Sequence, residues 1–256
     1  MNLTQLRVRL AVRKAKAFVQ SALECRIDRY RQASLVICVA LAGAGIPGTA
    51  AALNLEVPGC GNLANAFGPW DYRVDRGEPL RLVENAHFTP MVEGLIRGHT
   101  TTLPGPDLAY TLRAFPNHHR ALIATARLAD RLNTPQPSGM DYSIDCWYLR
   151  AITFKPDDLT ARMLYASWLG KHKRRDEAIQ QLKFVEIKSI DNPFTSYNVG
   201  LVYLEVEEFE AALRMARRAE TLGMQRQELK DALKAAGKWS DVPETAGAAA
   251  SAASAP

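Results

Sequence analysis

Two segments of the chain resemble each other at a fixed offset, and this offset constrains the fold more than any other feature. The first begins at residue 159 and reads LTARMLYASWLGKHKRRDEAIQQLKFVEI; the second begins at residue 194 and reads FTSYNVGLVYLEVEEFEAALRMARRAETL. Placing Ala178 over Ala212 defines the offset and also aligns Ala166 with Gly200. A repeating unit of about this length, made of two short helices, buries its apolar face only against its neighbours. The offset therefore predicts an all-α array of helical hairpins.

Small residues recur where the two helices of a unit must approach each other closely. Ala166 and Gly200 hold this position on the first helices, and Ala178, Ala212 and Ala219 hold it on the second helices. Large side chains around them fill the remaining space, so the paired helices pack with few voids. This pattern supports the hairpin interpretation independently of the offset.

A less regular unit precedes these two. NHHRALIATARLADRL, starting at residue 117, is expected to be its first helix, and CWYLRAITF, starting at residue 146, its second helix, with a long loop between them. After the third unit, RQELKDALKAAGKW places Leu229, Leu233 and Ala236 on one face, as a capping helix would. We expect about three hairpins, the first degenerate, in a domain spanning residues 110–239.

The segment before this domain, residues 53–109, is rich in Gly and Pro and poor in periodic apolar residues. We expect it to be an irregular arm with one short helix at residues 90–97, where Thr89 is the N-cap and Pro90 the first helical residue. The C-terminal segment, residues 240–256, has a low-complexity Ala- and Ser-rich sequence and is expected to be disordered.

Residues 1–52 have the pattern of a secretory signal peptide with a long basic n-region. An uncharged run, ASLVICVALAGAGIPGTAAA, follows the basic stretch and ends in small residues around Ala50. The pattern predicts export and cleavage, and a periplasmic location. An uncleaved inner-membrane anchor is the alternative, because the run is just long enough to span a bilayer.

The net charge of +5 does not indicate a nucleic-acid-binding surface. The first 50 residues contain eight basic and two acidic side chains, so the rest of the chain contains 24 basic and 25 acidic ones. A nearly neutral body lacks the basic footprint that a phosphate backbone requires. We therefore expect no nucleic-acid partner and no membrane span after the leader.

Two cysteines, Cys60 and Cys146, remain after removal of the leader. An even pair in an exported protein predicts one disulfide, and two cysteines allow one connectivity. This bond would tie the arm to the second helix of the degenerate unit.

The adjacent His118 and His119 are the strongest candidates for catalytic or metal chemistry. Asn117 is expected to be the N-cap of the following helix, which puts both histidines in its first turn, where the helix dipole disfavours protonation. Neighbouring helical residues point about 100° apart, so the pair is poorly placed to bind one zinc ion. Motifs for a serine nucleophile, a phosphate loop or a zinc protease do not occur. We expect no catalytic site, metal or cofactor.

The repeat pattern resembles the tetratricopeptide (TPR) family. The strings FGPWDYR and YTLRAFPNHHRAL also resemble segments of a group of exported proteobacterial TPR proteins. This resemblance implies a protein-interaction module, a scaffold or adaptor for an envelope protein. In such arrays the first helix of each repeat lines a concave groove. The expected partner-binding residues are Met163, Ser167, Lys171, Tyr197, Asn198, Leu201 and Glu205.

Three alternatives remain open on the sequence. The arm could fold back and fill the groove itself. The chain could be a metal-dependent or hydrolytic enzyme that uses His118 and His119. It could also be a structural subunit of an envelope assembly.

Overall fold

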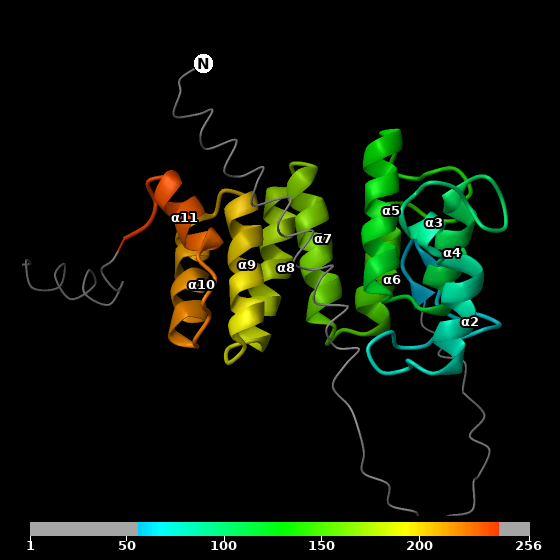
Figure 1. Ribbon diagram of the computed structural model, residues 1–256, viewed down its shortest axis with the longest axis horizontal. Helices are drawn as coiled ribbons and strands as arrows, with labels where there is room; N and C mark the ends of the chain where they lie inside the picture. The colour runs from blue at the N-terminus through cyan, green and yellow to red at the C-terminus, as the bar shows by residue number, and fades with distance from the viewer. Residues whose placement is uncertain (1–55, 241–256) are drawn as a thin grey trace, which may run out of the picture. The chain divides into compact units, whose positions relative to one another are not determined.

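A computed structural model of the chain describes residues 56–240, in which nearly all the regular secondary structure is helix (Figure 1). These residues form two compact units, 56–185 and 186–240. The expected signal peptide and the tail after residue 240 lie outside the described residues. Within residues 56–240, no helix is both long and apolar enough to cross a membrane. The all-α array of helical hairpins is confirmed.

The helices of the expected repeats begin and end close to the positions that the sequence suggests. The first, degenerate hairpin contains α5 (His119–Leu132) and α6 (Ile144–Phe154), joined by the long loop 133–143. The second hairpin contains α7 (Leu159–Lys171) and α8 (Arg175–Lys188). Arg162 joins these two helices, because its Nη1 donates to Gln181 at 2.9 Å and its guanidinium lies 3.9 Å from the Phe184 ring.

The third hairpin consists of α9 (Pro193–Glu205) and α10 (Phe209–Thr221), and α11 (Glu228–Ala235) follows it. Gly200 lies where the three helices meet. A Cβ on this residue would lie 2.5 Å from Cδ2 of Leu229 and 3.1 Å from Cβ of Met215. Only a glycine allows such a close approach without a shift in its neighbours. Leu229 and Leu233 are buried, as the capping-helix interpretation requires.

Each hairpin is entered through a turn of the same design. In the turns 115–118, 155–158 and 189–192, the fourth residue donates its backbone N–H to the carbonyl of the first, at 2.9, 3.0 and 3.2 Å. The side chain of that fourth residue then caps the next helix; the caps are His118, Asp158 and Asn192. The first two caps are further apart in the sequence than the second and third, because the loop 133–143 is long.

The arm contains more helix than we expected. It includes α2 (Glu78–His87), α3 (Pro90–Glu93) and the start of α4 (Pro104–Ala114), and α4 packs on both α2 and α5. The short helix begins at Pro90 after Thr89, as expected, but it ends at Glu93 and not at Arg97. Leu95 adopts a left-handed conformation (φ 56°), which a continuing helix does not allow.

The arm begins with a small antiparallel hairpin of β1 (Glu56–Val57) and β2 (Gly61–Asn62), in which Val57 pairs with Gly61. The disulfide Cys60–Cys146 connects the turn of this hairpin to α6, with a Cα–Cα distance of 5.2 Å. The predicted pairing is therefore confirmed.

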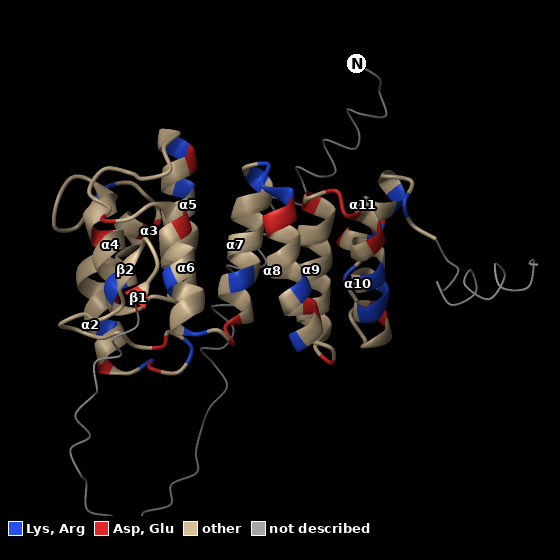
Figure 2. Ribbon diagram, turned by 180° about the vertical axis from the view of Figure 1, so that it is seen from behind, with Lys and Arg blue, Asp and Glu red and all other residues tan. Residues whose placement is uncertain are grey.

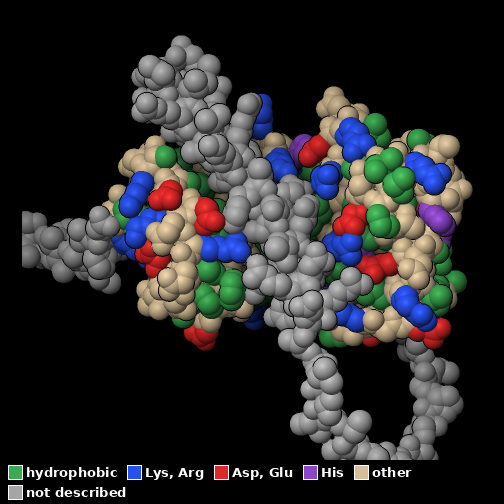
Figure 3. All heavy atoms as spheres, viewed as in Figure 1, with side chains coloured by type: hydrophobic (Ala, Val, Ile, Leu, Met, Phe, Trp, Pro, Cys, Tyr) green, Lys and Arg blue, Asp and Glu red, His purple; other side chains and the backbone are tan. Residues whose placement is uncertain are grey.

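Charged side chains of both signs are interspersed on the surface. Figure 2 shows acidic and basic residues together on α5 and on α10, and Figure 3 shows the same mixture on one face of the 56–185 unit. This distribution agrees with the nearly neutral charge of the chain after its leader.

Candidate functional site

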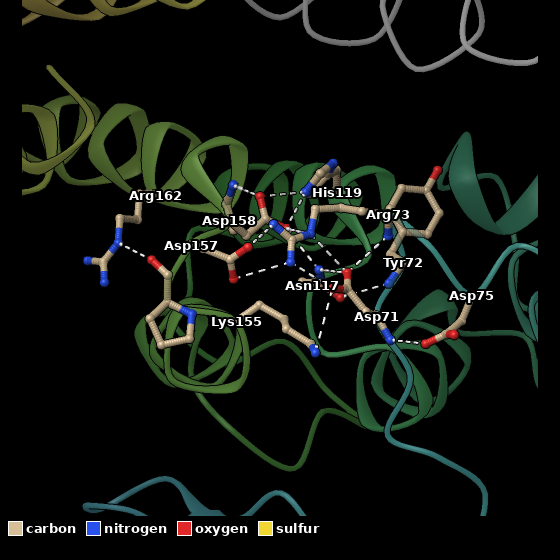
Figure 4. Close-up of polar contacts among 12 residues, drawn as sticks. Asp71, Tyr72, Arg73, Asp75, Asn117, His119, Lys155, Asp157, Asp158 and Arg162 are labelled. Atoms are coloured by element: carbon tan, nitrogen blue, oxygen red, sulfur yellow. Dashed lines mark hydrogen bonds and ion pairs between the residues drawn. The ribbon is translucent and has the colours of Figure 1, made fainter. Parts of the chain in front are cut away.

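A group of interacting polar side chains lies in the 56–185 unit, where three chain segments meet (Figure 4). We call it the polar cluster. One segment is FGPWDYR, residues 67–73, and the other two are the turns that precede α5 and α7. The polar cluster consists of Asp71, Arg73, Asn117, His119, Lys155, Asp157 and Asp158.

The FGPWDYR segment is fixed against α4 by its backbone and its aromatic side chains. The N–H of Trp70 donates to the carbonyl of Ala114 at 2.9 Å. Gly68 has φ +104°, and a Cβ on it would lie 2.5 Å from the same carbonyl oxygen, so the close approach requires glycine. Tyr72 is buried in an apolar group with Phe115. These contacts direct Asp71 and Arg73 toward the two turns.

Asn117 is the centre of the polar cluster. Its Nδ2 donates to Asp71 Oδ1 at 2.7 Å and to Asp158 Oδ2 at 2.8 Å, and its Oδ1 accepts from the backbone N–H of Tyr72 at 2.9 Å. The expectation that Asn117 caps α5 is therefore wrong. His118 is the N-cap, because its Nδ1 accepts from the N–H of Ala121 at 3.1 Å. The amide of Asn117, fully buried, instead bridges all three segments.

Asp158 has two functions in the polar cluster. One is to cap α7, since its Oδ1 accepts from the N–H of Ala161 at 3.0 Å. The other is to accept from His119 Nε2 at 2.8 Å and from Asn117. Burial alone would raise the pKa of Asp158, but the hydrogen bond and charge of His119, together with these other donors, outweigh burial and lower it. The carboxylate is therefore ionised and saturated with donors.

Arg73 joins the other two carboxylates. Its Nε and Nη2 donate to the two oxygens of Asp71 at 3.0 and 2.7 Å, and its Nη1 donates to Asp157 at 2.8 Å. Lys155 Nζ lies 3.7 Å from Asp71. Burial would raise the pKa of Asp71, but hydrogen bonds from Arg73 and Asn117 lower it well below its ordinary value. Asp71 is buried while Asp157 is exposed, so the pair with Asp71 is the one in which removal of Arg73 would leave a buried charge uncompensated.

The side chains of His118 and His119 form hydrogen bonds within the fold. Because Nδ1 of His118 accepts a backbone hydrogen bond, its Nε2 carries the proton, and this atom lies 3.3 Å from Glu84 Oε1. Burial lowers the pKa of His118, against the opposing effect of Glu84, so the ring is neutral near pH 7. Within residues 56–240, the hydrogen bonds of His118 and His119 include no serine, threonine or cysteine side chain that could act as a nucleophile.

Another buried carboxylate, Asp107, lies outside the polar cluster and holds the loop between α3 and α4. It accepts from the N–H of His99 at 2.7 Å, from Oγ1 of Thr100 at 2.7 Å and from Nδ1 of His87 at 2.9 Å. His87 stacks on Tyr110, with ring centroids 3.9 Å apart. In the part of the chain that the structure describes, no three His, Cys, Asp or Glu residues are grouped to hold a metal ion.

The expected partner-binding residues lie on the first helices of their hairpins, but most are buried. On α7, Met163 is 3% exposed, while Ser167 and Lys171 are half-buried. On α9, all four expected residues are at most 9% exposed: Tyr197, Asn198, Leu201 and Glu205. Tyr197 has an internal function, because its hydroxyl donates to Glu228 of α11 at 2.9 Å. The binding function of this set stays a prediction.

Little in the sequence indicates the polar cluster. Asp71 is separated from Asn117 by 46 positions, and Asn117 from Asp158 by 41 positions, and such spacing follows no helical or strand period. The usable signals are the strings FGPWDYR and YTLRAFPNHHRAL, which contain Asp71 and Asn117. In addition, Phe-Pro-Asn-His at residue 115 and Lys-Pro-Asp-Asp at residue 155 share a proline followed by polar residues.

Comparison with known proteins gave no match to any family model, curated protein or solved structure.

Proposed function

We propose that the chain is a periplasmic TPR-type protein-interaction module, a scaffold or adaptor for another envelope protein. The observation that carries this proposal is the run of helical hairpins entered through three turns of one design. Arrays of this kind present extended surfaces of helix side chains. The hydrogen bonds of the polar cluster join segments of the chain to one another, so we assign this cluster to stabilising the array.

Export is the second part of the proposal. A basic leader followed by an apolar run precedes the described residues, and the Cys60–Cys146 disulfide is compatible with an oxidising compartment. The periplasm is the compartment where a proteobacterial protein of this type would form such a bond. Fold alone does not identify the partner.

The geometry of the histidines argues against the enzyme alternative. A general base needs a ring nitrogen directed at a reacting group, within about 3 Å of the proton it takes. His118 uses Nδ1 to cap α5 and directs Nε2 at Glu84, while His119 directs Nε2 at Asp158. These contacts give both rings a role in positioning the turns.

Within the 56–185 unit, we place the partner-binding surface on α7. Ser167 and Lys171 lie on this helix, and α7 packs beside α5. His172, next to Lys171, lies 3.3 Å from Asp130 of α5, so the ends of the two helices form one polar surface. Figure 2 shows basic residues gathered at the α7–α8 turn. A polar surface that includes a lysine suits an acidic or carbonyl-rich peptide segment.

Photo-crosslinking in intact cells tests the proposal. A photoreactive amino acid replaces Ser167, and a matched control replaces Lys183, which is exposed on α8. The proposal predicts a discrete crosslinked partner from position 167 that is not obtained from position 183. If the two positions give the same adducts, or if only position 183 gives one, α7 is not the binding surface.

A further inference from the structure

The first described residues, 56–63, lie on α6 as a separate short element that we call the strap. The strap contains the short strands β1 and β2, which are paired antiparallel through a turn in which Cys60 N–H donates to Val57 O at 2.8 Å. An isolated hairpin of this length is not stable in water. Its position therefore depends on what it contacts on α6.

Arg150 of α6 provides the main polar contact with the strap. Its Nη1 donates to the carbonyls of Cys60 and Asn62, each at 2.9 Å. Arg150 is 2% exposed, and no carboxylate in the described part of the chain forms an ion pair with it. Its Nε is buried without a hydrogen-bond partner. A buried guanidinium normally has a carboxylate partner, so this one is unusual in relying on two carbonyls of one short segment.

Aromatic and aliphatic side chains provide the other contacts between the strap and the chain around Arg150. The Arg150 guanidinium lies 4.6 Å from the ring centroid of Tyr142 and 5.6 Å from that of Trp147. A Cβ on Gly61 would lie 2.5 Å from the Tyr142 hydroxyl oxygen, so the backbone of the strap passes directly against this ring. Val57, Cys60 and Leu63 pack with Phe154, and Leu63 is fully buried. The strap thus uses two carbonyls and two branched side chains, as a bound peptide does.

We propose that the face of α6 around Arg150 is a binding site for a short extended polypeptide segment, and that the strap fills it as a tethered ligand. The ligand class is defined by two main-chain carbonyls, those of alternate residues, with an aliphatic side chain on each side of them. The Cys60–Cys146 bond holds this ligand in place at a high effective concentration. This site uses residues of α6, whereas the proposed function uses Ser167 and Lys171 of α7, so neither proposal depends on the other.

Hydrogen exchange on the full chain gives the first test. In the Cys60→Ser, Cys146→Ser variant, the strap amides are expected to exchange at least about tenfold faster than in the oxidised protein, while α6 amides stay protected. A detachable ligand behaves in this way. If α6 loses protection in step with the strap, the strap is part of the core; if the strap keeps its full protection, it is not detachable. Either result would overturn the proposal.

A peptide in trans gives the second test. The full chain carries Cys60→Ser and Leu63→Asp, which weaken its own strap, and also Cys25→Ser and Cys38→Ser, so that Cys146 is the one cysteine left as a reporter. A synthetic peptide of residues 56–63, with its cysteine activated as an aryl disulfide, is added; the Cys146 thiolate attacks the peptide sulfur and the aryl thiolate leaves. If the peptide binds at the Arg150 site before it reacts, it should react about tenfold faster than a scrambled peptide. This rate ratio is equivalent to about 1.4 kcal/mol.

The Arg150→Lys substitution in the same chain is the control for recognition. It keeps the charge but removes Nη1, the atom that donates to both carbonyls, so the rate advantage of the strap peptide should disappear. Equal rates for the two peptides before this substitution, in a chain that circular dichroism shows to be folded, would contradict the proposal. If the Leu63→Asp chain does not fold, the hydrogen-exchange comparison decides.

Discussion

Asn117 has a role that few residue types could take. Its amide donates to two carboxylates, Asp71 and Asp158, and accepts from a backbone N–H, so one buried side chain satisfies three groups. Aspartate in its place would add a third buried negative charge, and leucine would remove one hydrogen bond from each of the three partners. Each buried polar group that loses its hydrogen-bond partner lowers the free energy of unfolding by about 1–3 kcal/mol.

We therefore predict that Asn117→Ala lowers the free energy of unfolding by about 3 kcal/mol, because two buried carboxylates lose a donor and one N–H loses an acceptor. The matched control is Asn85→Ala, at an exposed position of α2, which should change stability by less than about 0.5 kcal/mol. Urea unfolding measures both. Equal effects of the two substitutions would show that the polar cluster does not stabilise the fold.

The carboxylates of the polar cluster also predict how stability depends on pH. The pKa values of Asp71 and Asp158 are lowered from 3.8 in the folded chain. The unfolded chain therefore binds protons first as the pH falls, so the stability these groups contribute is full above their unfolded pKa and is lost below it. Urea unfolding should show a steep loss below about pH 4 that is weaker in Asp158→Asn. An unchanged pH profile in that variant would contradict the role of Asp158.

At the scale of elements, the three hairpin turns share a backbone design but differ in what surrounds them. His118 and Asp158 cap helices and also contact other segments, while the side chain of Asn192 caps α9 by accepting from Thr195 N–H at 2.9 Å. An N-cap contributes about 1 kcal/mol. The same turn therefore serves as a simple helix entry in one place and as a junction in another.

Paired substitutions separate these two roles. Asn192→Ala should lower the free energy of unfolding by about 1 kcal/mol, the loss of a cap. Asp158→Ala should lower it by about 3 kcal/mol or more, because Asn117 and His119 also lose their acceptor and Arg73 a neighbouring charge. Chemical denaturation of both variants checks the difference. A loss of no more than about 1 kcal/mol at Asp158 would mean that it acts only as a cap.

Some elements can be predicted well from the sequence and others poorly, for physical reasons. The helices α7 to α10 follow from the fixed offset that aligns Ala178 with Ala212, because packing between like units repeats the same small residues. The start of α4 is hard to predict, because Pro104, Gly105 and Pro106 resemble a turn; a proline is tolerated in a first helical turn, where its missing N–H has no partner to lose. The polar cluster is not predictable from local patterns, because tertiary contacts alone create it.

At the scale of the whole molecule, the chain combines an expected leader, a disulfide-fastened arm and a helical array. The disulfide closes a loop between residues separated by 86 positions, which contributes about 4 kcal/mol in the chain-entropy model. The disulfide is compatible with the proposed export, because such bonds persist mainly in oxidising compartments.

This account predicts a processed and fully oxidised protein in its native host. N-terminal sequencing should begin near Ala51 or Leu53, and thiol labelling of the denatured, unreduced protein should find no free cysteine. Two reactive thiols would rule out the Cys60–Cys146 bond in the cell. A chain that retains residues 1–50 would rule out cleavage of the leader.

Partner capture by variants of α7 tests the central claim most directly. Lys171→Glu and Lys183→Glu make the same charge change on α7 and on exposed α8, and Asn198→Ala extends the comparison to α9. With circular dichroism as the folding control, the interaction proposal predicts at least about a fivefold loss of partner capture for Lys171→Glu, or about 1 kcal/mol, and wild-type capture for Lys183→Glu. Folded Lys171→Glu and Asn198→Ala proteins that both capture partner at the wild-type level would contradict it.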